Sequence, residues 1–200
     1  MLRFSLGVAV VLLLAGCGGR FSTSYEGPLQ ADVARNWSVV DVQVDVPDTL
    51  VVNDANVLAP RGDIVWHGDP AGDRRAQVAT VVEAGVREGV APLSGANPVI
   101  FGVTVQEFHA VTPRAINSAP AAVHNISFTV QVFDANTAVP LSPPTLIEAD
   151  LEALVGAGAL IAAQEGRTQK VRITRHIAQV IQGWLGIGPD QRRKFTSLGR

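Results

Sequence analysis

Apolar and polar residues alternate along several stretches of the chain, a period of two that is typical of half-buried β-strands. Residues 40–46 place Val40, Val42 and Val44 on one expected core face. In residues 98–111 the alternation changes phase past Gln106, which predicts either a bulge or a change of the buried face, because a slip of one residue turns every side chain over. The stretches that we expect to be strands are residues 40–46, 64–66, 98–111, 122–134 and 145–155.

Two other stretches have the 3.6-residue period of an amphipathic helix. We expect one helix over residues 73–88, capped by Asp73, and another over residues 168–185, capped by Thr168. The apolar stripe of the first helix is Val78, Val81, Val82, Gly85 and Val86, and that of the second is Ile173, Ile177, Val180, Ile181 and Trp184. The order strand, helix, three strands, helix predicts an α+β fold. In this fold an antiparallel sheet of about four to five strands has two helices packed on one face, as a two-layer sandwich.

The first residues have a different pattern, that of an export signal. Arg3 precedes an apolar run of 12 residues, from Phe4 to Ala15, whereas a membrane-spanning helix needs about 20. Leu14-Ala15-Gly16-Cys17 then resembles the lipobox of bacterial lipoproteins. The resemblance implies cleavage before Cys17 and acylation of the cysteine, which is the only one in the chain. An ordinary secreted protein with a small buried cysteine is the alternative.

The lipobox resemblance also implies a location. In the sorting pattern of Gram-negative bacteria, an aspartate after the cysteine retains a lipoprotein at the inner membrane, and here that residue is Gly18. We therefore expect a protein that is lipid-anchored on the periplasmic face of the outer membrane, or on the cell membrane if the host has only one.

These patterns divide the chain into four parts. We expect a signal peptide over residues 1–16 and a lipidated cysteine with a flexible tether over residues 17–34. A single α+β domain follows over residues 35–187, with a frayed basic tail over residues 188–200.

Composition excludes two classes of protein. Apolar residues make up 47% of the chain and charged residues 17%, which is unlike a disordered protein. The net charge is −2, without the clustered basic excess that a nucleic-acid partner requires.

We find no motif for a metal, a cofactor or a covalent reaction, so we expect no catalytic residues, no metal ligands and no cofactor. His109 and His124 lie on neighbouring predicted strands and form the strongest metal candidate, although isolated histidines are far more common. His67 and Asp69 are the strongest acid–base candidate. The simpler interpretation of that segment is a turn at residues 68–70, with Trp66 in the core and Asp73 as a helix cap.

Residues 31–185 resemble an uncharacterised family of small bacterial outer-membrane lipoproteins, through residues 66–73, residues 102–109 and the final amphipathic helix. At the level of the fold, the order of elements is similar to that of auxiliary lipoproteins of ABC-type envelope transporters. That similarity implies a protein that binds partners or lipid and carries out no covalent reaction.

Three hypotheses for function follow. The first is a non-catalytic adaptor, or an accessory of an assembly or transport machine, held to membrane lipid through acylated Cys17 and docked on an envelope protein complex. The second is a carrier for a lipid or small apolar ligand. The third and most remote is a hydrolase that uses Asp69 and His67.

Overall fold

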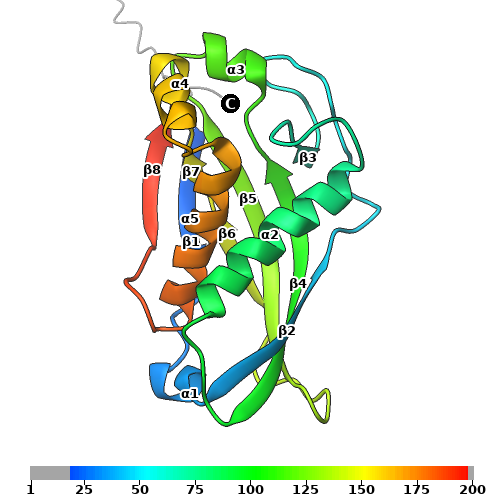
Figure 1. Cartoon of the computed structure of the whole chain (residues 1–200), viewed down its shortest axis with the longest axis vertical. Helices are drawn as coiled ribbons and strands as arrows, with labels where there is room; N and C mark the ends of the chain where they lie inside the picture. Colours follow the sequence, from blue (N-terminus) through cyan, green and yellow to red (C-terminus); the bar gives the residue numbers. More distant parts are fainter. Residues whose placement is uncertain (1–18, 198–200) are drawn as a thin grey trace, which may run out of the picture.

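The computed structural model of the protein describes residues 19–197, so the expected signal peptide and Cys17 lie outside the described residues. Within this range the chain forms one open eight-stranded sheet and five helices (Figure 1). The elements in chain order are β1 (Gly19–Tyr25), α1 (Ala31–Arg35), β2 (Trp37–Asp45), β3 (Ile64–Val65), α2 (Arg74–Val90), β4 (Asn97–His109), α3 (Pro113–Ser118), β5 (Val123–Asp134), β6 (Thr145–Ala149), β7 (Leu151–Glu152), α4 (Gly156–Gln164), α5 (Gln169–Trp184) and β8 (Arg193–Ser197).

The sheet is larger than the expected four to five strands, and it is mixed rather than antiparallel. Its strands follow the order β2-β4-β5-β6-β1-β8, while β3 pairs with β4 and β7 pairs with β5. The consecutive strands β4, β5 and β6 are antiparallel neighbours, as the sequence predicted. In contrast, β2 and β3 lie parallel to β4, because α2 carries the chain from one end of the sheet back to the other.

Helices α2 and α5 cross one face of the sheet, as expected from their apolar stripes (Figure 1). Every residue of the two predicted stripes is buried. The helices approach closely at Gly85 and Gly89, where an added Cβ would lie within 3.0 Å of Ile177 and Ile181 side-chain atoms. Both predicted caps form: Asp73 accepts a hydrogen bond from the Ala76 amide, and Thr168 accepts one from the Val171 amide.

One strand expectation is confirmed and another is wrong in part. The β4–β5 register shifts between Val105 and Glu107, which is the bulge that the phase change predicted. The β2–β4 register also shifts, between Val39 and Asp41. This bulge puts Val40 outside the core with 58% of its surface exposed, whereas the alternation had placed it with the buried Val42.

The ends of the described chain are ordered as strands where we had expected a flexible tether and a frayed tail. Strand β1 lies between β6 and β8, with Thr23 opposite Ala149 and Phe21 opposite Phe195. Its inward residues Phe21, Thr23 and Tyr25 are buried.

Side-chain hydrogen bonds fix β1 further. The Ser22 amide donates to Asp150 Oδ2 at 3.1 Å, and Ser24 Oγ donates to Glu148 at 2.7 Å. The Tyr25 hydroxyl donates to Asp190 at 2.8 Å. Because β1 is held on both sides, residues 19–25 belong to the sheet, although we had expected them in the tether.

Candidate functional site at the anchor-proximal end of the domain

The first residue of β1 lies at the end of the molecule that also carries α3 and α4 (Figure 1). Gly19 pairs with Ser197, the last residue of β8, and β8 runs toward α4. Two Cα–Cα steps separate Cys17 from Gly19, a span of at most about 7.6 Å. We call this end of the domain the anchor-proximal end, because a lipid on Cys17 would be attached next to it.

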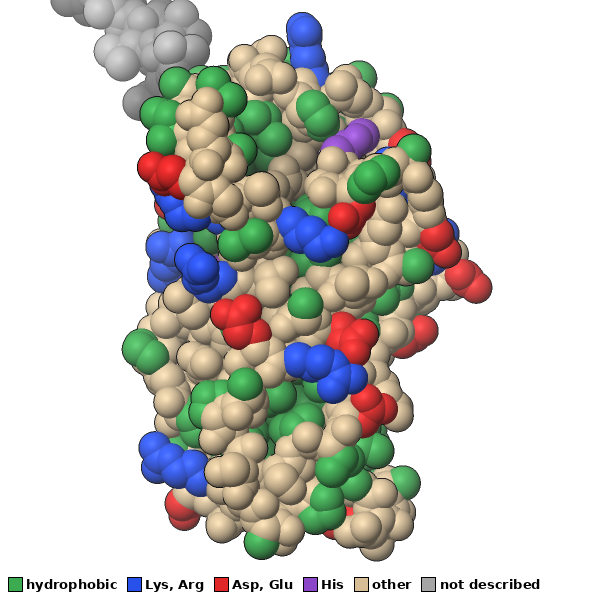
Figure 2. Space-filling view, in the orientation of Figure 1, with side chains coloured by type: hydrophobic (Ala, Val, Ile, Leu, Met, Phe, Trp, Pro, Cys, Tyr) green, Lys and Arg blue, Asp and Glu red, His purple; other side chains and the backbone are tan. Residues whose placement is uncertain are grey.

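Helix α4 gives this end an apolar surface. The helix has the sequence GAGALIAAQ, which contains no charged residue. Leu160 and Ile161 are 62% and 53% exposed, and hydrophobic side chains gather over α4 in the space-filling view (Figure 2). Soluble proteins rarely expose an apolar helix without charges to water. Such a surface is suited to contact with lipid.

A pocket of about 260 Å³ lies beside α4, between it, α3 and the start of α5. Its walls are mainly apolar and come from Ile116, Leu154, Ala159, Leu160, Ala162 and Ala163. Its polar lining residues include His124 at the start of β5, and Gln169 and Arg172 in the first turns of α5. We call this the His124 pocket.

His124 is buried and presents a hydrogen-bond donor without an acceptor. Its Nδ1 accepts a hydrogen bond from the Val111 amide at 3.3 Å. In the neutral ring the proton therefore resides on Nε2. That atom is buried and has no partner among the described residues, and neither has Nε2 of Gln169 in the same pocket. Buried polar atoms nearly always have partners, so two unpartnered donors on residues that line one pocket mark a place where an acceptor could bind.

The lining of the pocket includes two arginines, Arg167 and Arg172, but no aspartate or glutamate. Arg172 donates to the Glu152 carbonyl at 2.8 Å. Burial, followed by the charge of Arg167, lowers the pKa of the Arg172 guanidinium, while the charge of Glu152 acts in the opposite direction. Burial lowers the pKa of His124 to about 3, and the charges of Arg172 and His176 lower it further in the same direction. A bound anion would offset the unfavourable electrostatics around these groups.

His176 of α5 is a second buried histidine, close enough to His124 to affect its pKa, and it faces β1. Its Nε2 is 3.5 Å from the Thr23 hydroxyl, and burial lowers its pKa to about 4. The charges of Arg193 and Arg172 lower that pKa in the same direction, whereas a backbone hydrogen bond at Asp150 raises it. His176 therefore contributes a second neutral imidazole to the buried face between β1 and α5.

These two histidines predict a loss of stability in acid. Both are neutral in the fold but take up a proton near pH 6.5 when unfolded, so the unfolded chain binds more protons between about pH 6.5 and pH 3. The free energy of unfolding is expected to fall across this window by several kcal/mol, because each unit of pKa shift is worth about 1.4 kcal/mol. Urea unfolding at pH 7 and pH 4.5 measures this, and a His124→Gln variant should lose less stability than the wild type between the two. Equal losses would contradict the assignment.

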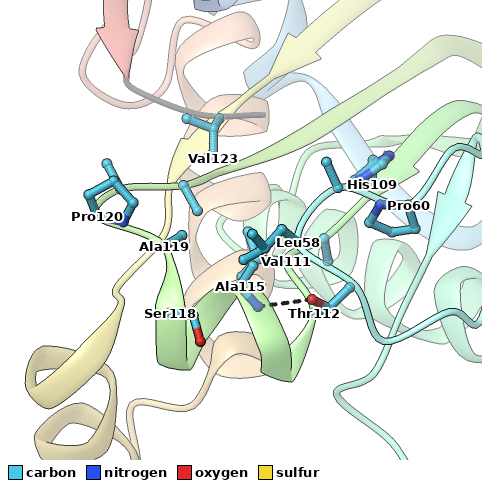
Figure 3. Close-up of a pocket in the computed structure, with 14 residues that line it drawn as sticks. Leu58, Pro60, His109, Val111, Thr112, Ala115, Ser118, Ala119, Pro120 and Val123 are labelled. Atoms are coloured by element: carbon cyan, nitrogen blue, oxygen red, sulfur yellow. Dashed lines mark hydrogen bonds between the residues drawn. The ribbon is translucent and has the colours of Figure 1, made fainter.

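A second, smaller pocket of about 170 Å³ lies on the other side of α3 (Figure 3). Leu58, Pro60, Val111 and Ala119 are among its apolar lining residues, and the His109 ring lies at its edge. Thr112 caps α3 there by accepting a hydrogen bond from the Ala115 amide at 3.1 Å (Figure 3). This pocket can accept a small apolar group, but it has no charged lining residue to orient one.

Asp69, which with His67 formed the candidate acid–base pair of a hydrolase, has other described hydrogen-bond partners. Asp69 Oδ2 accepts a hydrogen bond from Trp66 Nε1 and Oδ1 accepts one from Lys170, each at 2.8 Å. Both carboxylate oxygens are thus engaged by groups other than His67. Trp66 is fully buried, as the simpler interpretation of this segment predicted.

The structure separates His109 from His124. His109 is paired with Asn125 across β4 and β5, so His124, the neighbour of Asn125, points to the opposite face. His109 Nδ1 lies 3.1 Å from the Gly62 carbonyl. In the part of the chain that the structure describes, no three metal-ligating side chains form a group, and no helix has the length and apolar character to cross a bilayer.

The sequence contained one signal for the His124 pocket. His124 has the same parity as Ile126 and Phe128, so the alternation of β5 places a titratable residue on its apolar face. Gln169 and Arg172 gave no comparable signal, because they begin an amphipathic helix where polar residues are normal. Helix α4 was not predicted, since its apolar residues do not follow one face.

Comparisons with known proteins give a family and several remote structural likenesses, two of which follow. A model described as a family of unknown function (DUF6778) matches residues 37–200, and no curated protein matches the chain. A crystal structure described as a "putative lipoprotein" from Caulobacter crescentus CB15 is 11% identical, with a TM-score of 0.35, over 78% of this chain and 94% of that one. The PelC dodecamer from Paraburkholderia phytofirmans is also 11% identical, with a TM-score of 0.35, over 82% and 96%. Scores this low carry no argument about function, and the similarity to transporter auxiliary lipoproteins stays a prediction.

Proposed function

This chain belongs to the DUF6778 family, and we propose that it is a non-catalytic, lipid-anchored protein of the bacterial envelope that acts as an adaptor at the membrane surface. One observation carries the proposal: β1 begins two residues after Cys17 and is built into the sheet between β6 and β8. An acylated Cys17 would therefore hold the folded domain directly on the membrane, without a tether.

Stable anchoring follows from the chemistry of lipidation. Each buried methylene contributes about 0.8 kcal/mol, and two or more acyl chains make anchoring stable where a single one is marginal. Because the span from Cys17 to Gly19 is short, the anchor-proximal end with α4 would face the lipid, and Leu160 and Ile161 are the large apolar side chains exposed on that helix. The partner would then dock on the sides of the domain that remain accessible.

We propose that the partner docks on the exposed edge of strand β2. This strand is an edge strand, and its bulge presents Val40 to solvent. The start of β2 is bridged to Ser94 through Ser38, so the partner would add a strand to the sheet beyond that bridge.

Photo-crosslinking in cells tests the adaptor function. A photo-crosslinking residue at Val40 should capture one defined envelope protein when the domain is anchored, and not when Cys17→Ser removes the lipid. The matched control position is Val139, which is 55% exposed on the loop between β5 and β6. If Val40 captures nothing while the protein is found in the outer membrane, the adaptor function is wrong.

A second function, that of a carrier for a lipid or small apolar ligand, is favoured by a separate observation. The two pockets on either side of α3 have mainly apolar walls, and one of them opens beside the apolar surface of α4. Their volumes of about 170 and 260 Å³ fit a headgroup or the end of an acyl chain rather than a whole lipid. Captured lipid without captured protein at the anchor-proximal end would favour this function over the adaptor.

A further inference from the structure

From its geometry we infer that the His124 pocket binds the oxyanion of an acidic amphiphile, that is, a carboxylate or phosphate group that bears an apolar chain. The inference deepens the carrier function proposed above and does not depend on lipidation of Cys17. It rests on three features of the pocket: unpartnered donors, a cationic environment, and an apolar exit.

The donors come from two elements. His124 Nε2 and Gln169 Nε2 are both buried, and neither has a hydrogen-bond partner within the described range of 19–197. Since His124 Nδ1 is occupied by the Val111 amide, Nε2 of the neutral ring is available only as a donor. An oxyanion supplies acceptor lone pairs for both atoms, whereas an alcohol or amide would add a donor to a site that already has donors.

The cationic environment comes from the start of α5. Thr168, Gln169 and Arg172 all line the pocket, so the N-terminus of this 16-residue helix faces it, and helix N-termini favour anions. Arg172 is only partly buried and makes its described hydrogen bond to a neutral carbonyl, that of Glu152. The described carboxylate acting on it is that of Glu152, which does not line the pocket, so an anion in the pocket would add a second favourable charge contact to Arg172.

The apolar exit determines which anion fits. Leu160 lines the pocket and is also 62% exposed on the outer surface of α4, so the pocket wall continues into the apolar surface of the helix. A chain attached to the oxyanion can therefore lie along Leu160 and leave over the exposed surface of α4. With about 260 Å³, the pocket itself holds the acidic group and the first part of the chain.

Native mass spectrometry of the full chain, released from neutral detergent micelles, tests this inference. Oleate is the probe, oleyl alcohol is its uncharged match, and acetate and inorganic phosphate are the head-only controls. We expect one noncovalent oleate per chain, and binding weaker by about tenfold or more for oleyl alcohol, which lacks the charge-assisted hydrogen bonds. Equal retention of oleate and oleyl alcohol would overturn the proposal, and so would acetate or phosphate binding as tightly as oleate.

A pair of variants on α5 assigns the site. Arg172→Gln removes a charge that lines the pocket and should weaken oleate binding by about tenfold. Arg175→Gln removes the same charge from an exposed position outside the pocket lining and should leave binding unchanged. Equal effects of the two would overturn the assignment.

A measurement on the wild type does not depend on how the variants fold. On oleate binding, the Nε2 resonance of His124 should shift in ¹⁵N-histidine spectra, while that of His67, which lies outside the pocket, should not. An unchanged His124 resonance at saturating oleate would overturn the proposal. Failure of these tests would leave membrane anchoring intact, because anchoring is measured separately at Cys17.

Discussion

Replacement of Cys17 by Ser, with residues 1–16 exchanged for an ordinary cleavable export signal, is expected to move the protein from the membrane fraction to the soluble periplasm. The expected change in the ratio of bound to free protein is roughly a hundredfold or more, because the variant loses the methylenes of two or more acyl chains at about 0.8 kcal/mol each. Fractionation followed by immunoblotting measures this ratio. The native protein with its own signal is the control.

The same variant separates the lipid from the apolar surface of α4. Any remaining affinity for vesicles should depend on Leu160 and Ile161, which are the exposed apolar residues of that helix. A Leu160→Glu substitution should remove this weak binding, whereas a Val139→Glu substitution, at a similarly exposed residue outside α4, should not. A Cys17→Ser protein that stays in the membrane fraction as firmly as the native one would contradict lipid anchoring.

Truncation of Trp184 is expected to have the largest effect on stability. Trp184 is 1% exposed at the end of α5, and its ring lies edge-on against Phe101 of β4 at 6.5 Å between centroids. Phe101 in turn packs edge-on against Trp37 of β2, so the three rings connect the helix layer to two strands. A Trp184→Ala variant should lose about 3–5 kcal/mol of unfolding free energy, from lost apolar burial and the cavity left behind.

Urea denaturation of purified protein measures this loss. Trp184→Phe keeps an aromatic ring against Phe101 and should lose distinctly less, while Val139→Ala, at an exposed position, should change stability by less than about 0.5 kcal/mol. A loss of under about 1 kcal/mol for Trp184→Ala would contradict this prediction. It would mean that the contact of Trp184 with Phe101 adds little to the free energy of unfolding.

The elements that could be predicted from the sequence are those in which the spacing of apolar residues matches the face that is buried. The apolar stripes of α2 and α5 and the alternation of β4, β5 and β6 reflect contact with one face of the sheet, and each was found. The bulge at Val105 and Glu107 was also visible as a change of phase.

The edges of the sheet could not be predicted in the same way. In β8, Phe195 is the single large apolar residue, and the strand exists because β1 pairs with it. In β1, Phe21, Thr23 and Tyr25 do alternate inward, but three residues beside glycines do not distinguish a strand from a linker. Such strands are specified by distant partners rather than by their own composition. For the same reason the bulge in β2, which exposes Val40, follows from its pairing with β4.

The candidate site has one part that depends on a local sequence pattern and another that depends on contacts between distant residues. Lipidation of Cys17 stays a prediction, and it rests on immediate neighbours in the sequence because the lipobox is a local pattern. The His124 pocket was not predicted, because His124, Gln169 and Arg172 come together only when β5 packs against the start of α5. A histidine at a core position of a strand was the one local sign of it.

The most direct test of the central claim is the mass of the N-terminal peptide of the protein purified from membranes. Our account predicts a chain that begins at Cys17, with a diacylglycerol on the thiol and an acylated amine, so that the lipid is attached two residues before β1. A chain that is cleaved elsewhere, or that carries an unmodified Cys17, would contradict it.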